Sequence, residues 1–295
     1  MKIQSVGVVN QSASNVSANK NFKNSQPQKP SFGFNLQSAI STTWKSADEI
    51  SSSLSKNYGM STEFRGNDLV ANMVERTVNI FKSIFPVAFL PGVVKFEHLN
   101  KENTLGRFCP YSTVYINANK DRFYNRTLLQ EKSANESFCL PLCKPFHSTK
   151  SELNVFVHEF VHCAHFKNIW KNGNYNSWEE LENVPAPDFY ERVLNLKKIG
   201  KYATQDGSIY EVIAESLTRQ ILEYPESILY NDKSKLFNFP DIPSTNAQKF
   251  LRAFWDGEVE EAKRLRYDVS DESYDKRSDD EYDFMMHSIS AITGW

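Results

Sequence analysis

The chain has 295 residues, of which 40% are hydrophobic, so it is long enough and apolar enough for one large domain with a real core. Its 34 basic and 36 acidic residues give a net charge of -2, which argues against nucleic-acid binding through a basic surface. No stretch approaches the roughly 20 apolar residues that cross a membrane, so neither nucleic acid nor a membrane is an expected partner.

Residues 1–47 are dominated by Ser, Asn, Gln and Lys, with five lysines and no acidic residue. Such a segment cannot bury enough apolar surface to offset the entropy of ordering, so we predict a disordered arm. It also lacks the uninterrupted apolar run of a secretory signal, which indicates a soluble protein that stays in the cytoplasm or is exported by another route. A folded domain is expected over residues 48–295.

After the arm, apolar residues recur mostly at helical spacing, and two short β-branched or aromatic runs stand between turn formers. This pattern predicts an α+β fold that is mostly helical with a small sheet. The C-terminal region, 256–295, is acidic, and we expect it to be exposed helix or loop with a further helical stretch at 282–292. The other predicted helices are 69–85, 148–168, 188–198, 209–222 and one around 250–255, and the predicted strands are 93–96 and 112–117.

The pentapeptide His158-Glu159-Phe160-Val161-His162 lies inside a strongly apolar helical run. On a helix the two histidines share one face and can bind one metal ion, and zinc suits such a pair. Glu159 is placed to act as general base toward a water whose pKa zinc lowers to about 7. Chance would produce the pattern in roughly one such sequence in a hundred. The alternative is a helix whose histidines are satisfied internally, although burying these polar groups without partners is costly.

A catalytic zinc site needs a third protein ligand and leaves its fourth position for water. Glu211 and Glu215 are one turn apart on one face of the predicted helix 209–222, so one can bind the metal while the other orients a histidine. Ser208 and Glu211 also match the spacing of a capping box. If capping is the whole role of Glu211, then Glu215 becomes the ligand.

His165 is a further histidine on the face of the helix that carries His158. It lies seven residues on, and at a rise of about 1.5 Å per residue the two are too far apart to bind one tetrahedral ion. We therefore predict that His165 is a second-shell or pocket residue.

Three short motifs follow one another within about residues 110–240. In order they are His158-Glu159-x-x-His162, Tyr202-Ala203-Thr204 and Glu211-x-x-Ala214-Glu215. Motif by motif, they resemble the catalytic domain of gluzincin metallopeptidases, most similar in style to the anthrax lethal factor group.

The resemblance implies a zincin-like catalytic domain with Zn2+ on His158, His162 and Glu211, and with Glu215 in the outer shell. It also implies that Tyr202 assists the oxyanion, although the loop between Tyr202 and Glu211 is slightly longer here than in the family. A phenol suits that task chemically, and Tyr210 is the alternative candidate.

In zincins an edge strand beside the active-site helix pairs with extended substrate through backbone hydrogen bonds. By its order in the chain, the predicted strand at 114–117 is the candidate for this role. The alternative is an ordinary core strand.

These observations predict a zinc-dependent endopeptidase that hydrolyses peptide bonds of a protein or peptide substrate with a metal-activated water. The first alternative is a zincin-fold binding or effector module without general proteolysis, which would suit a toxin-like protein with a flexible leader. The second is a metal-free helical interaction protein in which the histidine motif arises by chance.

Overall fold

The computed structural model describes most of the chain between residues 35 and 270, and all of its described elements belong to the unit Phe32–Trp295. The predicted helix at 188–198, the residue Tyr202 and the segment 282–292 lie outside the described residues. The described residues are 35–100, 104–110, 112–136, 147–172, 208–228, 232–242 and 244–270, together with 180, 199 and 203.

The first helix, α1 (Leu36–Ile40), lies within the stretch that was expected to be a disordered arm. Its apolar side chains, Leu36, Ala39 and Ile40, pack against the core at spacings of three and four residues. The expectation is therefore wrong for this part of the arm, because a stripe of three apolar residues is diluted by the polar residues around it. Residues 1–34 lie outside the described part of the chain.

Helix α2 (Ala47–Tyr58) begins close to the predicted onset of folded sequence. Its start is stabilised by a capping box, in which Ser46 and Glu49 each bind the other's backbone amide. Helix α3 (Asp68–Ile84) confirms the prediction of a helix at 69–85, and its last turn is followed by Pro86, which cannot continue a helix.

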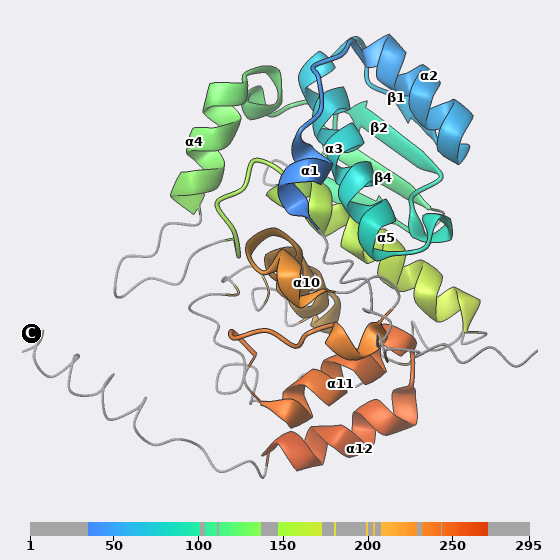
Figure 1. Ribbon diagram of the computed structural model, residues 1–295, viewed down its shortest axis with the longest axis vertical. Coiled ribbons are helices and arrows are strands. Elements are labelled where there is room, and N and C mark those ends of the chain that lie inside the picture. The colour runs from blue at the N-terminus through green and yellow to red at the C-terminus, as the bar shows by residue number, and fades with distance from the viewer. Residues whose placement is uncertain are drawn as a thin grey trace, which may run out of the picture. The chain divides into compact units, whose positions relative to one another are not determined.

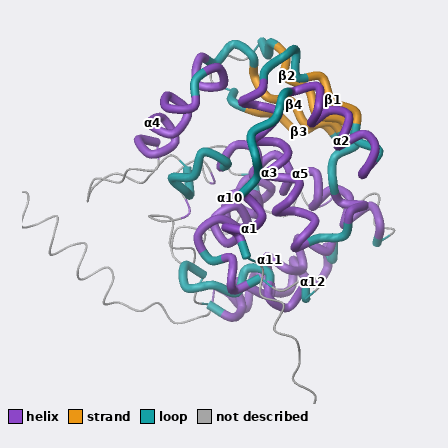
Figure 2. Tube along the Cα trace, turned by 45° about the horizontal axis from the view of Figure 1, so that its top comes forward, coloured by secondary structure: helices purple, strands orange, loops and turns teal. Residues whose placement is uncertain are grey.

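Four short strands form one sheet in the order β1-β2-β4-β3. Strands β1, β2 and β4 run parallel to one another. Strand β3 runs antiparallel to β4 and forms one edge of the sheet. Figure 2 shows the strands gathered on one side of the helices. The strands are β1 (Ser61–Glu63), β2 (Val93–Glu97), β3 (Gly106–Cys109) and β4 (Thr113–Asn117).

Both predicted strands are confirmed, as β2 and β4, but the position expected for the 114–117 strand is wrong. β4 lies inside the sheet between β2 and β3, so it is not an edge strand. The edge beside α5 is β3, which contains Gly106 and Arg107 and is only four residues long. A four-residue strand that begins with glycine gives little strand signal, which explains why β3 was not predicted.

Helix α5 (Asn154–Lys171) lies between the sheet and the C-terminal helices, as Figure 1 shows. It contacts β3 and β4 on one side and α10 (Ile209–Glu223) and α11 (Thr245–Asp256) on the other. This position explains why the helix is buried on most of its circumference. It begins six residues later than predicted from 148, because the preceding residues form a loop.

The remaining helices surround this centre. The predicted helices at 209–222 and around 250–255 are confirmed as α10 and α11. Among the described helices, none combines the length and hydrophobicity that crossing a membrane requires. The other helices are α4 (Arg126–Glu136) and α12 (Val259–Ser270), and short 3-10 turns are η1 (Val87–Phe89), η2 (Asp121–Tyr124), η3 (Pro225–Ser227) and η4 (Lys233–Lys235).

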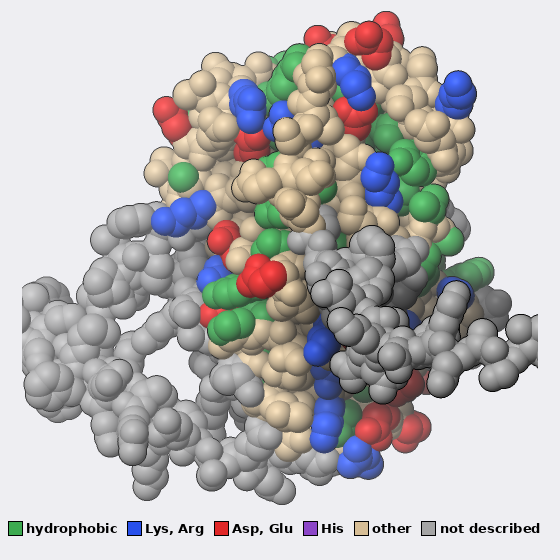
Figure 3. Space-filling view, in the orientation of Figure 1, with side chains coloured by type: hydrophobic (Ala, Val, Ile, Leu, Met, Phe, Trp, Pro, Cys, Tyr) green, Lys and Arg blue, Asp and Glu red, His purple; other side chains and the backbone are tan. Residues whose placement is uncertain are grey.

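Charged side chains of both signs occur on the face shown in Figure 3. Among the described residues, Lys233 pairs with Asp256 and Arg126 with Glu152, and in each pair the basic side chain is about half exposed. Pairs of this kind contribute little to stability individually.

His165 joins α5 to α11. Its Nε2–H donates to the backbone oxygen of Phe254 at 2.9 Å, and its ring stacks on Trp255 with ring centroids 5.2 Å apart. The side chain is fully buried, and burial lowers the pKa of His165 to about 3. The imidazole is therefore neutral in the folded protein at neutral pH.

This buried imidazole predicts an acid-sensitive fold. The unfolded chain binds a proton at His165 below about pH 6.5 but the folded protein does not, so stability is present above that pH and is lost as pH falls. The loss is up to about 1.4 kcal/mol per pH unit from this residue. Replacing His165→Gln keeps a donor near Nε2 and removes the titration. Urea unfolding between pH 7 and pH 5 should show a shallower loss in the variant, and equal slopes would contradict this explanation.

Candidate metal centre

Helix α5 presents His158, Glu159 and His162 at the wall of a cleft, and each of these residues is more than nine-tenths buried. The two histidines are one helical turn apart, so their rings share a face, with centroids 4.7 Å apart. The local spacing in the sequence is therefore enough to bring the predicted pair together.

A third side chain comes from α10, which packs along α5. The Oε2 atom of Glu211 lies 3.0 Å from His158 Nε2 and 3.4 Å from His162 Nε2, and the two Nε2 atoms are 3.0 Å apart. A tetrahedral zinc ion with bonds of about 2 Å separates its ligand atoms by about 3.3 Å. The three atoms therefore have the spacing needed to hold such an ion.

The hydrogen bonding of His158 favours a positive charge between its Nε2 atom, His162 and Glu211. Its Nδ1 atom lies 3.0 Å from Glu215 Oε1, and we assign the ring N–H to Nδ1 as the donor to that carboxylate. In the neutral ring, Nε2 then directs a lone pair toward His162 and Glu211, an arrangement that is repulsive unless a cation or proton lies among them. Burial lowers the pKa of His158, but the bonds to Glu211 and Glu215 outweigh it and raise this pKa well above its usual value.

Glu215 lies one turn beyond Glu211 and is fully buried, away from the cleft. Its Oε2 atom accepts the backbone N–H of Ser148 at 2.8 Å, while Oε1 faces His158. Burial alone would raise the pKa of Glu215, but hydrogen bonds with His147 and His158 lower it to about 2. The charged carboxylate therefore orients His158 from behind, which is the outer-shell position expected for Glu215.

The capping alternative for Glu211 is not observed. Ser208 is the N-cap of α10, but its side chain makes no capping hydrogen bond, and Glu211 instead lines the cleft. Burial would raise the pKa of Glu211, but the adjacent His162 and the hydrogen bonds from His158 and His162 lower it. Glu211 is therefore a charged carboxylate directed at the two imidazoles.

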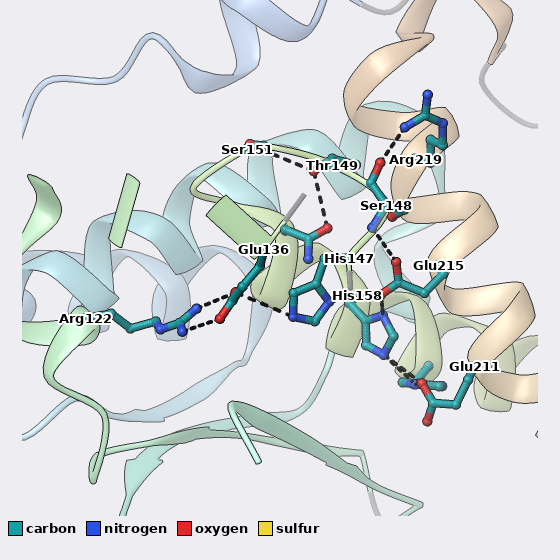
Figure 4. A network of polar contacts seen from close by, with 12 residues as sticks. Arg122, Glu136, His147, Ser148, Thr149, Ser151, His158, Glu211, Glu215 and Arg219 are labelled. Atoms are coloured by element: carbon teal, nitrogen blue, oxygen red, sulfur yellow. Dashed lines mark hydrogen bonds and ion pairs between the residues drawn. The ribbon is translucent and has the colours of Figure 1, made fainter. Parts of the chain in front are cut away.

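A network of polar contacts, shown in Figure 4, extends from Glu215 through the loop before α5. His147 Nδ1 lies 3.5 Å from Glu215 Oε1, and its Nε2 lies 3.8 Å from Glu136 Oε2. Glu136 in turn binds both terminal nitrogens of Arg122. His147 was missed by sequence reasoning, because a lone histidine eleven residues before His158 has no spacing that signals a shared site.

Arg219 fastens the same loop to α10. Its Nη1 donates to the backbone oxygen of Ser148, and its Nε donates to the fully buried carboxylate of Asp241. The N–H of Ser148 therefore binds Glu215 while its C=O binds Arg219, so both backbone groups of one residue are used to hold α10. Sequence patterns contain no sign of such backbone contacts.

Glu159 lies on the side of α5 that faces the edge strand β3, beside the two histidines. A Cβ atom added to Gly106 of that strand would lie 2.8 Å from Glu159 Oε1, and the Phe108 ring is nearly parallel to the ring of His162, with centroids 6.5 Å apart. Burial raises the pKa of Glu159, and the nearby charges of His158 and His162 offset only part of that effect. A carboxylate with a raised pKa is a stronger base than an ordinary glutamate.

The cleft beside these residues has a volume of 770 Å³. One wall is made by β3 and the segment that follows β2, and the other by α5 and the first turn of α10. His158, Glu159, His162 and Glu211 all line this cleft, so the four residues face a common space that is open to a substrate.

The other candidate residues from the sequence are Tyr202, Tyr210 and His165. Tyr202 lies outside the described residues, so its expected role stays a prediction. Tyr210 lines the cleft. His165, expected to be a second-shell or pocket residue, packs between Tyr210 and Trp255 and is not among the described residues that line the cleft. The difference arises because the helix turns its ring toward α11, where Phe254 offers a buried acceptor.

No protein-family model, curated protein or solved structure matches the chain. The resemblance to gluzincins therefore stays a prediction. The case for a function rests on the geometry of the described residues.

The two glutamates are expected to differ in their contribution to stability. In metal-free protein, Glu215→Ala leaves the Ser148 N–H and the His158 Nδ1–H without their acceptor, so we expect it to lower the free energy of unfolding by about 2–4 kcal/mol. Glu211→Ala should cost less, because Glu211 borders the cleft and is 20% exposed. Urea denaturation in the presence of a chelator measures both variants. An equal or larger loss for Glu211→Ala would contradict the outer-shell role of Glu215.

Proposed function

We propose that the chain is a zinc-dependent endopeptidase that hydrolyses peptide bonds of a protein or peptide substrate. The observation that carries this proposal is the convergence of His158 Nε2, His162 Nε2 and Glu211 Oε2 at the wall of an open cleft. Three protein ligands are the number that catalytic zinc sites use, since the fourth position is needed for the reaction.

The residues around the three ligands have distinct tasks in this proposal. Zinc, when bound, would acidify a water and polarise the substrate carbonyl. Glu159 accepts a proton from the attacking water and delivers it to the nitrogen of the leaving amine as the C–N bond breaks. Glu215 keeps the Nε2 lone pair of His158 directed at the centre.

A tyrosine hydroxyl completes the proposed set as a donor to the oxygen that becomes negative during attack. The family resemblance implies Tyr202 for this task. Tyr210 remains the alternative and has the support of its position in the cleft wall.

The edge strand β3 suits the binding of an extended peptide. The amide of Asn117 donates to Leu105 O at 2.9 Å, which makes 105 and 117 a hydrogen-bonded antiparallel pair. By alternation, the backbone groups of Gly106 and Phe108 point away from β4, toward the edge of β3 that no other described strand covers and that lines the cleft. A substrate strand added there would run past the metal centre with its backbone held in place, which favours a peptide over a small molecule.

Metal content tests the ligand assignment. Elemental analysis of purified wild type should find about one zinc per chain, and His162→Ala and Glu211→Ala should lose it. Glu215→Gln is the matched outer-shell control, and we expect it to weaken zinc affinity by about 10- to 100-fold without abolishing binding. Zinc that survives Glu211→Ala but not Glu215→Gln would move the ligand role to Glu215. Absence of zinc from wild type would contradict the proposal.

Substitution of the general base tests the reaction. Glu159→Gln removes the proton acceptor but keeps the shape of the side chain, so we expect zinc to remain bound while peptide cleavage falls by at least about 100-fold. The measurement is hydrolysis of a broad peptide library by zinc-loaded wild type and variant. Turnover by Glu159→Gln equal to that of wild type would contradict the mechanism. If wild type binds zinc but shows no turnover, the result would favour a binding module.

A further inference from the structure

Gly106 of the edge strand lies unusually close to Glu159. A Cβ atom added to Gly106 would lie 2.7 Å from Cγ, 2.8 Å from Oε1 and 3.0 Å from Cδ of Glu159. Distances under 3.0 Å between such atoms are essentially never found, so the strand and the glutamate can approach this closely only because residue 106 has no side chain.

The backbone conformation of residue 106 does not explain the glycine. The glycines with positive φ among the described residues are Gly59, Gly66 and Gly257, and Gly106 sits in regular antiparallel pairing with Ile116. Any residue can adopt that conformation, and glycine usually weakens a strand. The reason for glycine here is therefore space.

Glu159 lies on the buried helix α5 and is itself more than nine-tenths buried. The atoms that the added Cβ would meet belong to the flexible end of its side chain, which borders the cleft, so that end would be pushed toward the cleft. The ring of Phe108 lies over His162 on the same side of the helix. The glutamate therefore lies between β3 and its own helix, with the cleft on its remaining side.

We propose that Gly106 is a positioning residue for the general base, because its missing side chain lets β3 hold the Glu159 carboxylate at the wall of the cleft. This inference rests on the proposed function in taking Glu159 as the base. Gly106 contributes the room that the carboxylate occupies beside β3. Any side chain at position 106 would displace the carboxylate from this place.

The first test compares two glycine-to-alanine variants in the same sheet region. Gly106→Ala is expected to lower kcat by about 100-fold, the typical effect of moving a catalytic group by about 1 Å, with KM and zinc content close to wild type. Gly92→Ala is the matched control, because its added Cβ would meet Ser112 Oγ at an ordinary 3.4 Å. It should retain wild-type kcat. A kcat for Gly106→Ala equal to that of wild type would overturn the proposal.

The second test does not depend on activity. Thermal unfolding is measured for wild type, Gly106→Ala, Glu159→Ala and the double variant, in the presence of a chelator. Gly106→Ala should lower Tm when Glu159 is present and should leave Tm unchanged or raise it when residue 159 is alanine, because the clash is then gone. If Gly106→Ala fails to fold, recovery of folding in the double variant supports the same contact. Equal Tm changes in both backgrounds would overturn it.

The two tests separate this inference from the proposed function. If wild type cleaves no peptide, the endopeptidase proposal fails, and the coupling between positions 106 and 159 in the unfolding data still decides whether the steric contact exists. If wild type is active and Gly106→Ala is equally active, only the positioning role of Gly106 is lost.

Discussion

The buried carboxylate of Glu215 is the group on which the arrangement of the metal centre depends. A charge in the interior is strongly unfavourable unless hydrogen bonds compensate it, and Glu215 obtains them from two different segments. Ser148 donates from the loop before α5, and His158 donates from α5 itself. These bonds hold α10 at one rotation relative to α5. Glu211, one turn earlier on α10, is thereby brought to 3.0 Å from His158 Nε2.

Helix α5 connects this polar arrangement to the rest of the fold. Its apolar residues face the sheet and α3, where for example Phe81 of α3 packs edge-on against Phe160. Its polar residues divide between two neighbours, since the histidines face α10 and Glu159 faces β3. The proposed base and the two histidine ligands thus come from one helix, but their positions are set by contacts with different elements.

Regular elements with strong periodicity were predictable. The helix α3, the strands β2 and β4 and the helix α10 appear close to their predicted bounds, because each combines a clear apolar pattern with turn or cap residues at its ends. Helix α2 was not predicted although its sequence has this combination, whereas two other missed elements lack it. α4 buries few apolar side chains, and β3 contains a glycine and only four residues. The loop around Ser148 has no periodicity at all, although both of its backbone groups serve the centre.

The sequence by itself determined the pairing of His158 with His162, and it placed Glu211 and Glu215 on one face of a second helix. Both results follow from helical geometry, which brings residues four apart onto the same side. Only the tertiary structure decided which glutamate faces the cleft, that His165 turns toward α11, and that β3 rather than β4 is the edge beside α5. These outcomes depend on how helices rotate against each other and how strands order in the sheet. Contacts between residues far apart in the chain control both, and no local pattern encodes them.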